Sequence, residues 1–143
     1  MNVAALLKSK GNQVVTTAPE ALVAEVVSIL AERRIGAVVV SRDGQRVEGI
    51  LSERDIVRRL AIDHAALMSL RARDIMTTRV YTCSPGDDVA ELMAVMTARR
   101  IRHIPVMEDG ALCGIVSIGD VVKSRVEEIE REAEALRAYV VQS

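Results

Sequence analysis

The chain has 143 residues, half of them apolar, and its 19 Lys and Arg nearly balance 20 Asp and Glu, for a formal net charge of −1. This length fits one compact domain, and the near-neutral charge leaves no global field for binding nucleic acid or an anionic membrane surface. Cys83 and Cys113 form no metal or redox motif, so we expect a protein without zinc. No stretch reaches the roughly 18–20 apolar residues of a membrane span, and residues 1–10 lack a secretory signal. We therefore expect the protein to be cytoplasmic.

The first half of the chain predicts a strand, a helix, two strands and a second helix. Pro19 suits the first turn of a helix, and apolar residues then recur at three- and four-residue steps until Gly36 ends the pattern. Phe and Trp are absent, so the core must be built from aliphatic side chains. The other predicted elements are a buried strand over 37–40, a turn at 43–44, a strand over 48–51 and a helix over 53–62.

The second half repeats the first about 66 residues later, with Pro85 opening its first helix. Because a half of roughly 60 residues is marginal alone, we expect the two copies to share a core. The best-matched segments are 14–19 with 80–85, 33–35 with 99–101, and 49–52 with 114–117. The predicted boundaries are 1–62 for the first copy, 63–73 for a linker, 74–125 for the second copy and 126–143 for a C-terminal helical extension.

The last predicted helix continues well past its counterpart in the first copy. Apolar residues step by four and three from Val122 to Val140, which gives a heptad-like seam with charged residues elsewhere on the helix. Three heptads are short, so packing against the helix's own domain is an alternative. The seam favours contact with a second subunit.

Both copies carry the pattern Gly, apolar, apolar, Ser, two variable residues, Asp where a strand meets a helix. Ser52 and Ser117 can accept hydrogen bonds from the first helical amides, and Asp55 and Asp120 complete what resembles a capping box. Helix capping alone explains the pattern. The same place also suits a nucleotide, because free amides and the helix dipole attract phosphate and a carboxylate one turn in can accept two hydroxyl protons from a ribose.

The repeated unit resembles a tandem pair of CBS domains. The resemblance rests on Asp-Ile-Met-Thr at 74–77, on Ile-Arg-His-Ile-Pro-Val at 101–106 and on the order of the motifs, which occur twice and cover nearly the whole chain. It implies an α/β (α+β) fold of two βαββα repeats in a pseudo-twofold arrangement, with clefts that bind adenine nucleotides such as AMP, ADP, ATP, NAD or S-adenosylmethionine. It also implies a homodimer and a regulated partner protein.

The resemblance assigns the ribose hydroxyls to Asp55 and Asp120 and places Ser52 and Ser117 beside the ribose or the phosphate. The two copies then carry equivalent sugar-binding groups at the entrance of equivalent helices. On this reading the nucleotide lies in the cleft between the repeats.

By the same resemblance, Arg102 and His103 face phosphate, Arg54 is a further phosphate candidate, and Gly119 allows close approach of the backbone. The first copy lacks the basic pair, so we expect the two sites to differ and the second copy's pocket to be preferred. The residues expected to border the base are Thr16, Ala37, Val38, Thr82, Ile104 and Pro105.

By the resemblance, AMP is the expected ligand, with ATP and NAD as alternatives among which the sequence itself does not choose. The expected role is that of a sensor that signals to a partner. An enzyme is disfavoured, because the repeats use up the chain and leave no nucleophile with an adjacent base and no metal constellation. A structural or protein-interaction pair with empty clefts stays open as the second interpretation.

Overall fold

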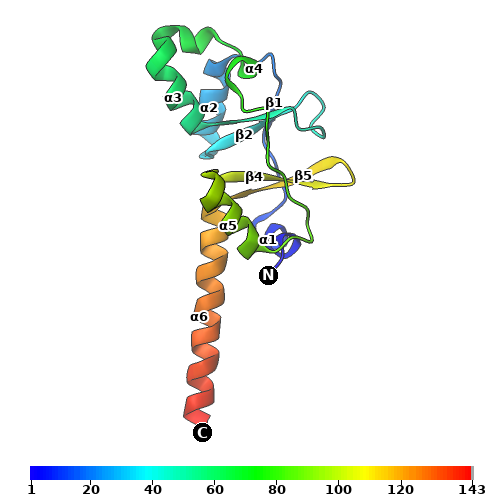
Figure 1. The fold of residues 1–143 in the computed structure, drawn as a ribbon, viewed down its shortest axis with the longest axis vertical. Coiled ribbons are helices and arrows are strands. Elements are labelled where there is room, and N and C mark those ends of the chain that lie inside the picture. The colour runs from blue at the N-terminus through cyan, green and yellow to red at the C-terminus, as the bar shows by residue number, and fades with distance from the viewer. Residues whose placement is uncertain (143) are drawn as a thin grey trace.

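The computed structural model describes residues 1–142, which form two α/β repeats and one long helix (Figure 1). The first repeat contains β1 (Thr16–Thr17), α2 (Val23–Arg33), β2 (Ala37–Val40), β3 (Gly49–Ser52) and α3 (Glu53–Asp63). The second contains α5 (Val89–Arg99), β4 (His103–Glu108), β5 (Ala111–Ser117) and α6 (Ile118–Gln142). The predicted α/β class and the extended last helix are thus confirmed. No helix within residues 1–142 is long and apolar enough to cross a membrane.

The two sheets have the same core but differ at one edge. In the first repeat β1 lies parallel to β2, and β2 pairs antiparallel with β3. In the second repeat β4 and β5 form an antiparallel pair, and the expected opening strand is reduced to one parallel bridge between Cys83 and Val106. Thr82, expected in that strand, is therefore exposed and outside it.

The prolines lie before the helices and not within their first turns. Pro19 and Pro85 sit in turns, and α2 and α5 begin only at Val23 and Val89. The prediction that each proline opens its helix was therefore wrong by about one turn, because the chain first makes a turn closed by main-chain hydrogen bonds such as Asp87 N–H to Ser84 C=O at 3.0 Å.

Each repeat is completed by a segment that belongs to the other in sequence. Helix α1 (Val3–Lys10) buries Val3, Leu6 and Leu7 in the core of the second repeat. The linker elements η1 (His64–Ser69) and α4 (Ala72–Ile75) bury Leu67 and Ala72 in the core of the first. The two repeats consequently depend on one another for their hydrophobic cores.

Both cores are aliphatic. Residues with no exposed surface include Leu51 and Val38 in the first repeat and Ile104 in the second. Cys83 is also buried, as its alignment with Thr17 predicts, and burial raises the pKa of its thiol to about 12. A thiol held protonated in this way packs as a small apolar side chain and is not a reactive nucleophile.

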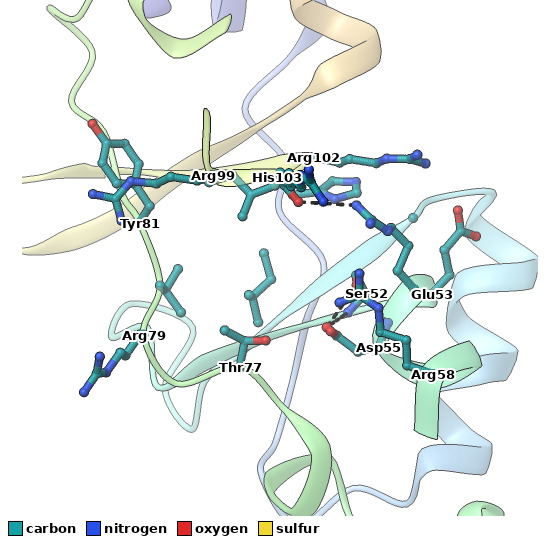
Figure 2. Close-up of a pocket in the computed structure, with 16 residues that line it drawn as sticks. Ser52, Glu53, Asp55, Arg58, Thr77, Arg79, Tyr81, Arg99, Arg102 and His103 are labelled. Carbon is teal, nitrogen blue, oxygen red and sulfur yellow. Dashed lines mark hydrogen bonds between the residues drawn. The ribbon is translucent and has the colours of Figure 1, made fainter. Parts of the chain in front are cut away.

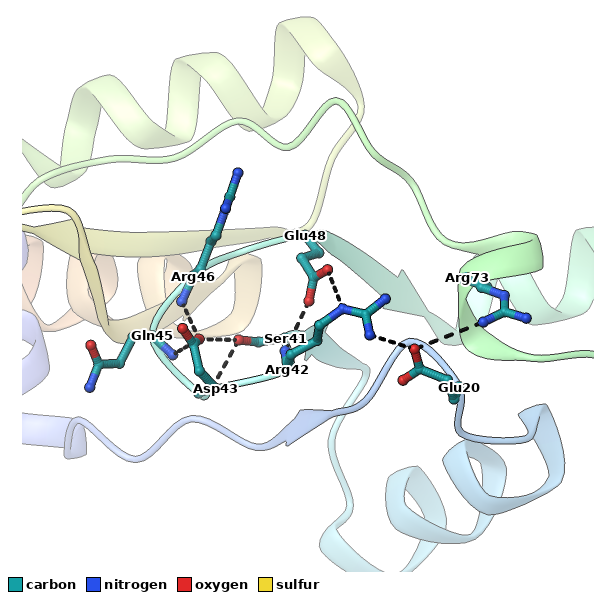
Figure 3. Close-up of polar contacts among 9 residues, drawn as sticks. Glu20, Ser41, Arg42, Asp43, Gln45, Arg46, Glu48 and Arg73 are labelled. Carbon is teal, nitrogen blue, oxygen red and sulfur yellow. Dashed lines mark hydrogen bonds and ion pairs between the residues drawn. The ribbon is translucent and has the colours of Figure 1, made fainter.

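The turn between β2 and β3 is held by its own side chains (Figure 3). The Asp43 carboxylate accepts hydrogen bonds from the backbone N–H groups of Arg46 at 2.8 Å and Gln45 at 2.9 Å, and these bonds hold its pKa below the ordinary value. Gly44 takes the positive φ of 77° that the turn requires. The Gln45 carbonyl then accepts from the N–H of Leu112, which ties the turn to the second repeat.

The glycine that opens each repeated motif marks a close approach of two segments. A Cβ atom on Gly49 would lie 2.6 Å from Met76 Sδ and 3.0 Å from the Thr77 carbonyl oxygen. A Cβ atom on Gly114 would lie 2.8 Å from the methyl groups of Leu7. The motif therefore begins with glycine because another segment packs directly on the strand.

We predict that Gly49→Ala lowers the free energy of unfolding by about 1–3 kcal/mol, because the added methyl group overpacks this contact. Gly86→Ala is the matched control, since a Cβ atom there meets nothing within 4 Å. Urea unfolding followed by circular dichroism measures both variants. Equal stability of the two variants would contradict the packing role of Gly49.

Candidate functional site

Two cavities lie where the repeats meet, one at the N-terminus of α3 and one at the N-terminus of α6. Their volumes are about 230 Å³ and 500 Å³, and we call them the first and second cavity. Four residues line both, namely Gly36, Glu53, Arg102 and His103. The cavities are thus adjacent and share a wall at the centre of the module.

The junction between β3 and α3 in the first repeat forms part of the wall of the first cavity, as Figure 2 shows. The Ser52 hydroxyl accepts a hydrogen bond from the Asp55 N–H at 3.2 Å, and the Asp55 carboxylate accepts from the Ser52 N–H at 3.0 Å. This reciprocal pair is the predicted capping box. It fixes the Asp55 side chain at the cavity wall.

The second cavity repeats this geometry at the start of α6. The Ser117 hydroxyl accepts from the Asp120 N–H at 3.1 Å, and the Asp120 carboxylate accepts from the Ser117 N–H at 2.9 Å. Both junctions also use the first helical amide in the same way, since Glu53 N–H donates to Gly36 at 2.9 Å and Ile118 donates to the Arg102 carbonyl at 2.8 Å. The duplication is therefore preserved in detail.

Capping leaves each helix entrance with binding capacity. Of the first three amides of each helix, those of Arg54 and Gly119 have no acceptor within residues 1–142. One oxygen of each carboxylate, Oδ1 of Asp55 and of Asp120, likewise takes part in none of the hydrogen bonds among the described residues. A free amide at the positive end of a helix suits an anion, and a free carboxylate oxygen accepts from hydroxyl groups.

Lys10 distinguishes the two entrances. Its ammonium group, at the end of α1, donates to the Asp120 carboxylate at 2.5 Å and to the Ile115 carbonyl at 2.8 Å. Burial alone would raise the pKa of Asp120, but the hydrogen bonds from Lys10 and Ser117 outweigh burial and hold the pKa below its ordinary value. Met76 aligns with Lys10 in the second copy of the sequence and packs on the first repeat, so Asp55 has no such cation.

The shared wall explains why the repeats differ in sequence there. His103 lies against Gly36, where a Cβ atom would come within 3.1 Å of the imidazole ring. Gly36 and Ala37 are the counterparts of Arg102 and His103. The first repeat therefore has small residues where the second repeat has large ones. Burial lowers the pKa of His103, although the nearby Glu53 carboxylate acts in the opposite direction. Because of this lowered pKa, the imidazole is neutral at pH 7.

The structure brings most of the predicted site residues to the cavities. The first cavity is lined by Ser52, Arg54, Asp55, Arg102 and His103. The second cavity is lined by Ala37, Arg102, His103, Ser117, Gly119 and Asp120. The basic pair predicted for the second copy's pocket therefore also faces the helix entrance of the first copy.

The residues expected to border a base are placed differently. Val38 and Ile104 are fully buried in the two cores, and Pro105 is buried on β4. Thr16 lies in β1 and Thr82 in the exposed segment before α5, and neither lines the two cavities. Of the residues expected to border the base, only Ala37 lines a cavity. The cavity walls near the other positions are formed by residues adjacent to them in the sequence.

Several cavity residues were not identified from the sequence. They are Lys10, Glu53, Arg58, Thr77, Arg79, Tyr81, Arg99 and Arg100. The Arg99 guanidinium lies over the Tyr81 ring, 4.9 Å from the ring centre. Tyr81 aligns with Val15 of the first copy. That exchange of an aliphatic for an aromatic residue between aligned copies was the available signal.

The fold and the paired cavities define a tandem module with two related clefts. A family model described as the CBS domain matches residues 9–62 and 72–127, which together make up most of the chain. The chain therefore belongs to the CBS-domain family. No group of three or more His, Cys, Asp or Glu that could hold a metal ion occurs among the residues that the structure describes.

Relatives agree with this assignment. A CBS-domain-containing protein from Agrobacterium tumefaciens has a similar solved structure, with 42% identity, a TM-score of 0.85, and coverage of 87% of this chain and 99% of that one. A CBS-domain protein from Pyrobaculum aerophilum, solved in complex with AMP, is 30% identical over 84% of this chain and 89% of that one, with a TM-score of 0.74.

Among curated proteins, the mitochondrial CBS domain-containing protein CBSX3 of Arabidopsis thaliana is 38% identical over 120 residues, which are 81% of this chain and 58% of that protein. An uncharacterised protein encoded in a ribosomal RNA operon of Thermofilum pendens is 39% identical over 118 residues, which are 81% of this chain and 38% of that protein. The chain thus spans less than two thirds of the length of these two curated relatives.

We predict that Lys10→Met, which installs the residue that aligns with Lys10 in the other copy, lowers the free energy of unfolding at pH 7 by about 0.5–1 kcal/mol, the range for a partly exposed pair. The depressed pKa of Asp120 means that the ion pair stabilises the folded state above about pH 4 and is lost as the pH falls through the folded pKa. The stability curves of wild type and variant should therefore converge in acid.

The control for this prediction is Lys8→Met on the same helix, whose side chain is exposed and makes no ion pair within residues 1–142. Urea unfolding between pH 3 and pH 7 gives the comparison. A Lys10→Met curve parallel to that of the wild type would show that the pair does not stabilise the fold.

Proposed function

We propose that this protein is a regulatory module that binds an adenine nucleotide between its two CBS repeats and signals the bound state to a partner protein. The observation that carries the proposal is the repeated helix entrance, where a free amide and a free carboxylate oxygen face a cavity in both repeats. The AMP bound by the Pyrobaculum aerophilum relative supports the same chemistry.

The unit that the first cavity suits is adenosine 5′-phosphate, which AMP, ATP and NAD share, with AMP as the simplest ligand. The Asp55 carboxylate accepts the ribose hydroxyls, and the Arg54 amide at the N-terminus of α3 meets the phosphate. Aliphatic side chains such as Ile50 and Val80 cover the base together with Tyr81. Burial of a base against such a surface contributes a few kcal/mol, as expected for micromolar affinity.

The signal passes through the wall that the cavities share. Gly36, Glu53, Arg102 and His103 contact both cavities, so a ligand in either one touches groups that belong to both repeats. A ligand that bridges two packed units stabilises their assembly by its binding free energy. The module acts by binding and not by catalysis.

We predict that Asp55→Asn weakens AMP binding by at least about 10-fold, the loss expected when a hydrogen bond to a charged group becomes neutral. Asparagine keeps an oxygen for the Ser52 N–H, so the helix cap is retained. Glu91→Gln is the control, because Glu91 is exposed on α5 and lines neither cavity. Isothermal titration calorimetry measures the affinities.

The nucleotide-free alternative makes the opposite prediction for the same titration. If AMP, ATP and NAD at millimolar concentration give no heat of binding and do not stabilise the protein thermally, the result supports a structural or protein-interaction pair with well-capped helices. The absorbance of the purified protein near 260 nm gives an early indication, because the two tyrosines mask little there.

We further propose a homodimer formed through α6, whose C-terminal half projects away from the rest of the molecule in Figure 1. Its apolar seam is exposed, with Val126, Ile129 and Leu136 about half exposed or more. The seam alternates steps of four and three from Val122 to Val140, with valine and alanine at one set of positions and Val, Ile or Leu at the other. This composition suits a two-stranded coiled coil.

The charges beside the seam favour a parallel pair. In a parallel dimer Arg125 of one helix faces Glu130 of the other, and Glu132 faces Arg137, so every flanking pair is attractive. In an antiparallel dimer centred on the seam, the two Glu130 side chains face each other, as do the two Glu132 side chains. Like charges repel, so the parallel orientation is the one we propose.

Ile129→Glu should dissociate the dimer, because it places two carboxylates in the centre of the seam, whereas Arg131→Glu on the outer face should not. Sedimentation velocity at micromolar concentration separates the two outcomes. In a Cys113→Ser background, Leu136→Cys should cross-link two copies under mild oxidation only if the helices are parallel. A monomeric wild type, or a dimer that survives Ile129→Glu, would contradict the proposed interface.

A further inference from the structure

The first cavity is surrounded by an unusual number of cations. Six arginines line it, and against them stand the two carboxylates of Glu53 and Asp55. The six are Arg54, Arg58, Arg79, Arg99, Arg100 and Arg102. We call them the arginine cluster.

None of the arginine cluster is neutralised by an acid within residues 1–142. The ion pairs among the described residues involve Arg42, Arg59, Arg73, Arg125 and Lys10, and none of the cluster. Arg54 donates instead to the Arg100 carbonyl at 3.3 Å. Uncompensated cations gathered around a concave surface create a local positive potential that attracts anions.

The second cavity lacks this excess of positive charge, although the duplicated sequence makes it the counterpart of the first cavity. The counterparts of Arg54 and Arg79 are Gly119 and Gln13, whereas Arg102 lines both cavities. Three cations line the second cavity, and one of them, Lys10, is already paired with Asp120. Two aligned positions in the sequence therefore contribute to the charge difference between the cavities.

From this difference we propose that the first cavity selects an adenosine polyphosphate, such as ATP, over AMP, and that the second cavity does not. The inference rests on the proposed nucleotide site and names its preferred ligand class. The Asp55 entrance takes the sugar and the Arg54 amide takes the first phosphate. Further phosphates then meet guanidinium groups, which bind phosphate oxygens through paired N–H donors.

A small polyanion fits this cluster better than a nucleic acid does. The arginines line a cavity at the junction of two repeats, and Figure 2 shows them spread around it, with Arg79 and Arg99 on one side and Arg58 and Arg102 on the other. The protein as a whole carries a formal net charge of −1, so beyond the cavity a long polyanion gains little. The selected ligand is thus a compact molecule with several phosphate groups.

The experiment is calorimetry of the full-length protein with adenosine, AMP, ADP and ATP, each at low and moderate salt. We expect affinity at one of the two sites to rise about 10-fold or more from AMP to ATP at low salt, and this ratio to shrink as salt screens the charges. Arg79→Gln, which installs the residue found at the equivalent position of the second cavity, should reduce the ATP-to-AMP ratio at least about 3-fold. Arg46→Gln, at an exposed position outside both cavities, should leave the ratio unchanged.

The outcomes separate this inference from the function on which it rests. Equal affinity for AMP, ADP and ATP would overturn the polyphosphate preference and leave the nucleotide module intact. Failure of every adenosine compound to bind would overturn both. Tighter binding of a short single-stranded oligonucleotide than of ATP would overturn the preference in favour of a nucleic-acid role for the arginine cluster.

Discussion

Because α1 packs in the core of the second repeat and the linker of η1 and α4 packs in the core of the first, neither half of the chain can bury its apolar surface without the other. This mutual completion holds the two strand–helix junctions at a fixed separation and places both beside one shared wall. The cavities are a product of that assembly. A single repeat in isolation would have the capping box but no second wall to face it.

The shared wall also explains how a duplicated sequence comes to have two unequal sites. Groups near a pseudo-twofold axis approach their own counterparts, so there is room for one large side chain and not for two. His103 occupies that space and Gly36 leaves it open. Divergence at the axis is accompanied by divergence farther out, where Lys10 forms an ion pair with Asp120 and Asp55 has no such partner among the described residues.

The periodicity of the sequence predicted the fold class, the order of elements and the long last helix, because aliphatic patterning and helix caps are local signals. The capping boxes at Ser52 and Ser117 were predictable for the same reason. The exchange of α1 and the linker between repeats was not, since nothing local in residues 3–10 specifies which core they join. The burial of Val38 and Ile104 shows the same limit, because a position adjacent to a site can point its side chain into the core.

Tertiary contacts likewise decided which charges gather at the cavities. Arg79 and Arg99 lie 20 residues apart in the sequence, and Arg58 comes from the other repeat, so their convergence depends on how the repeats stack. Lys10 reaches Asp120 across 110 residues. Such pairings follow from packing and cannot be read from spacing.

Helix α6 begins at the second cavity, where Ser117 and Asp120 cap it, and runs without interruption for 25 residues. At 1.5 Å per residue it is a rigid arm of about 37 Å. Tilting such an arm by roughly 5° at its capped end moves its tip by about 3 Å, a geometric gain that follows from helix length alone. A small change in tilt at the second cavity is thereby magnified into a larger displacement of the tip.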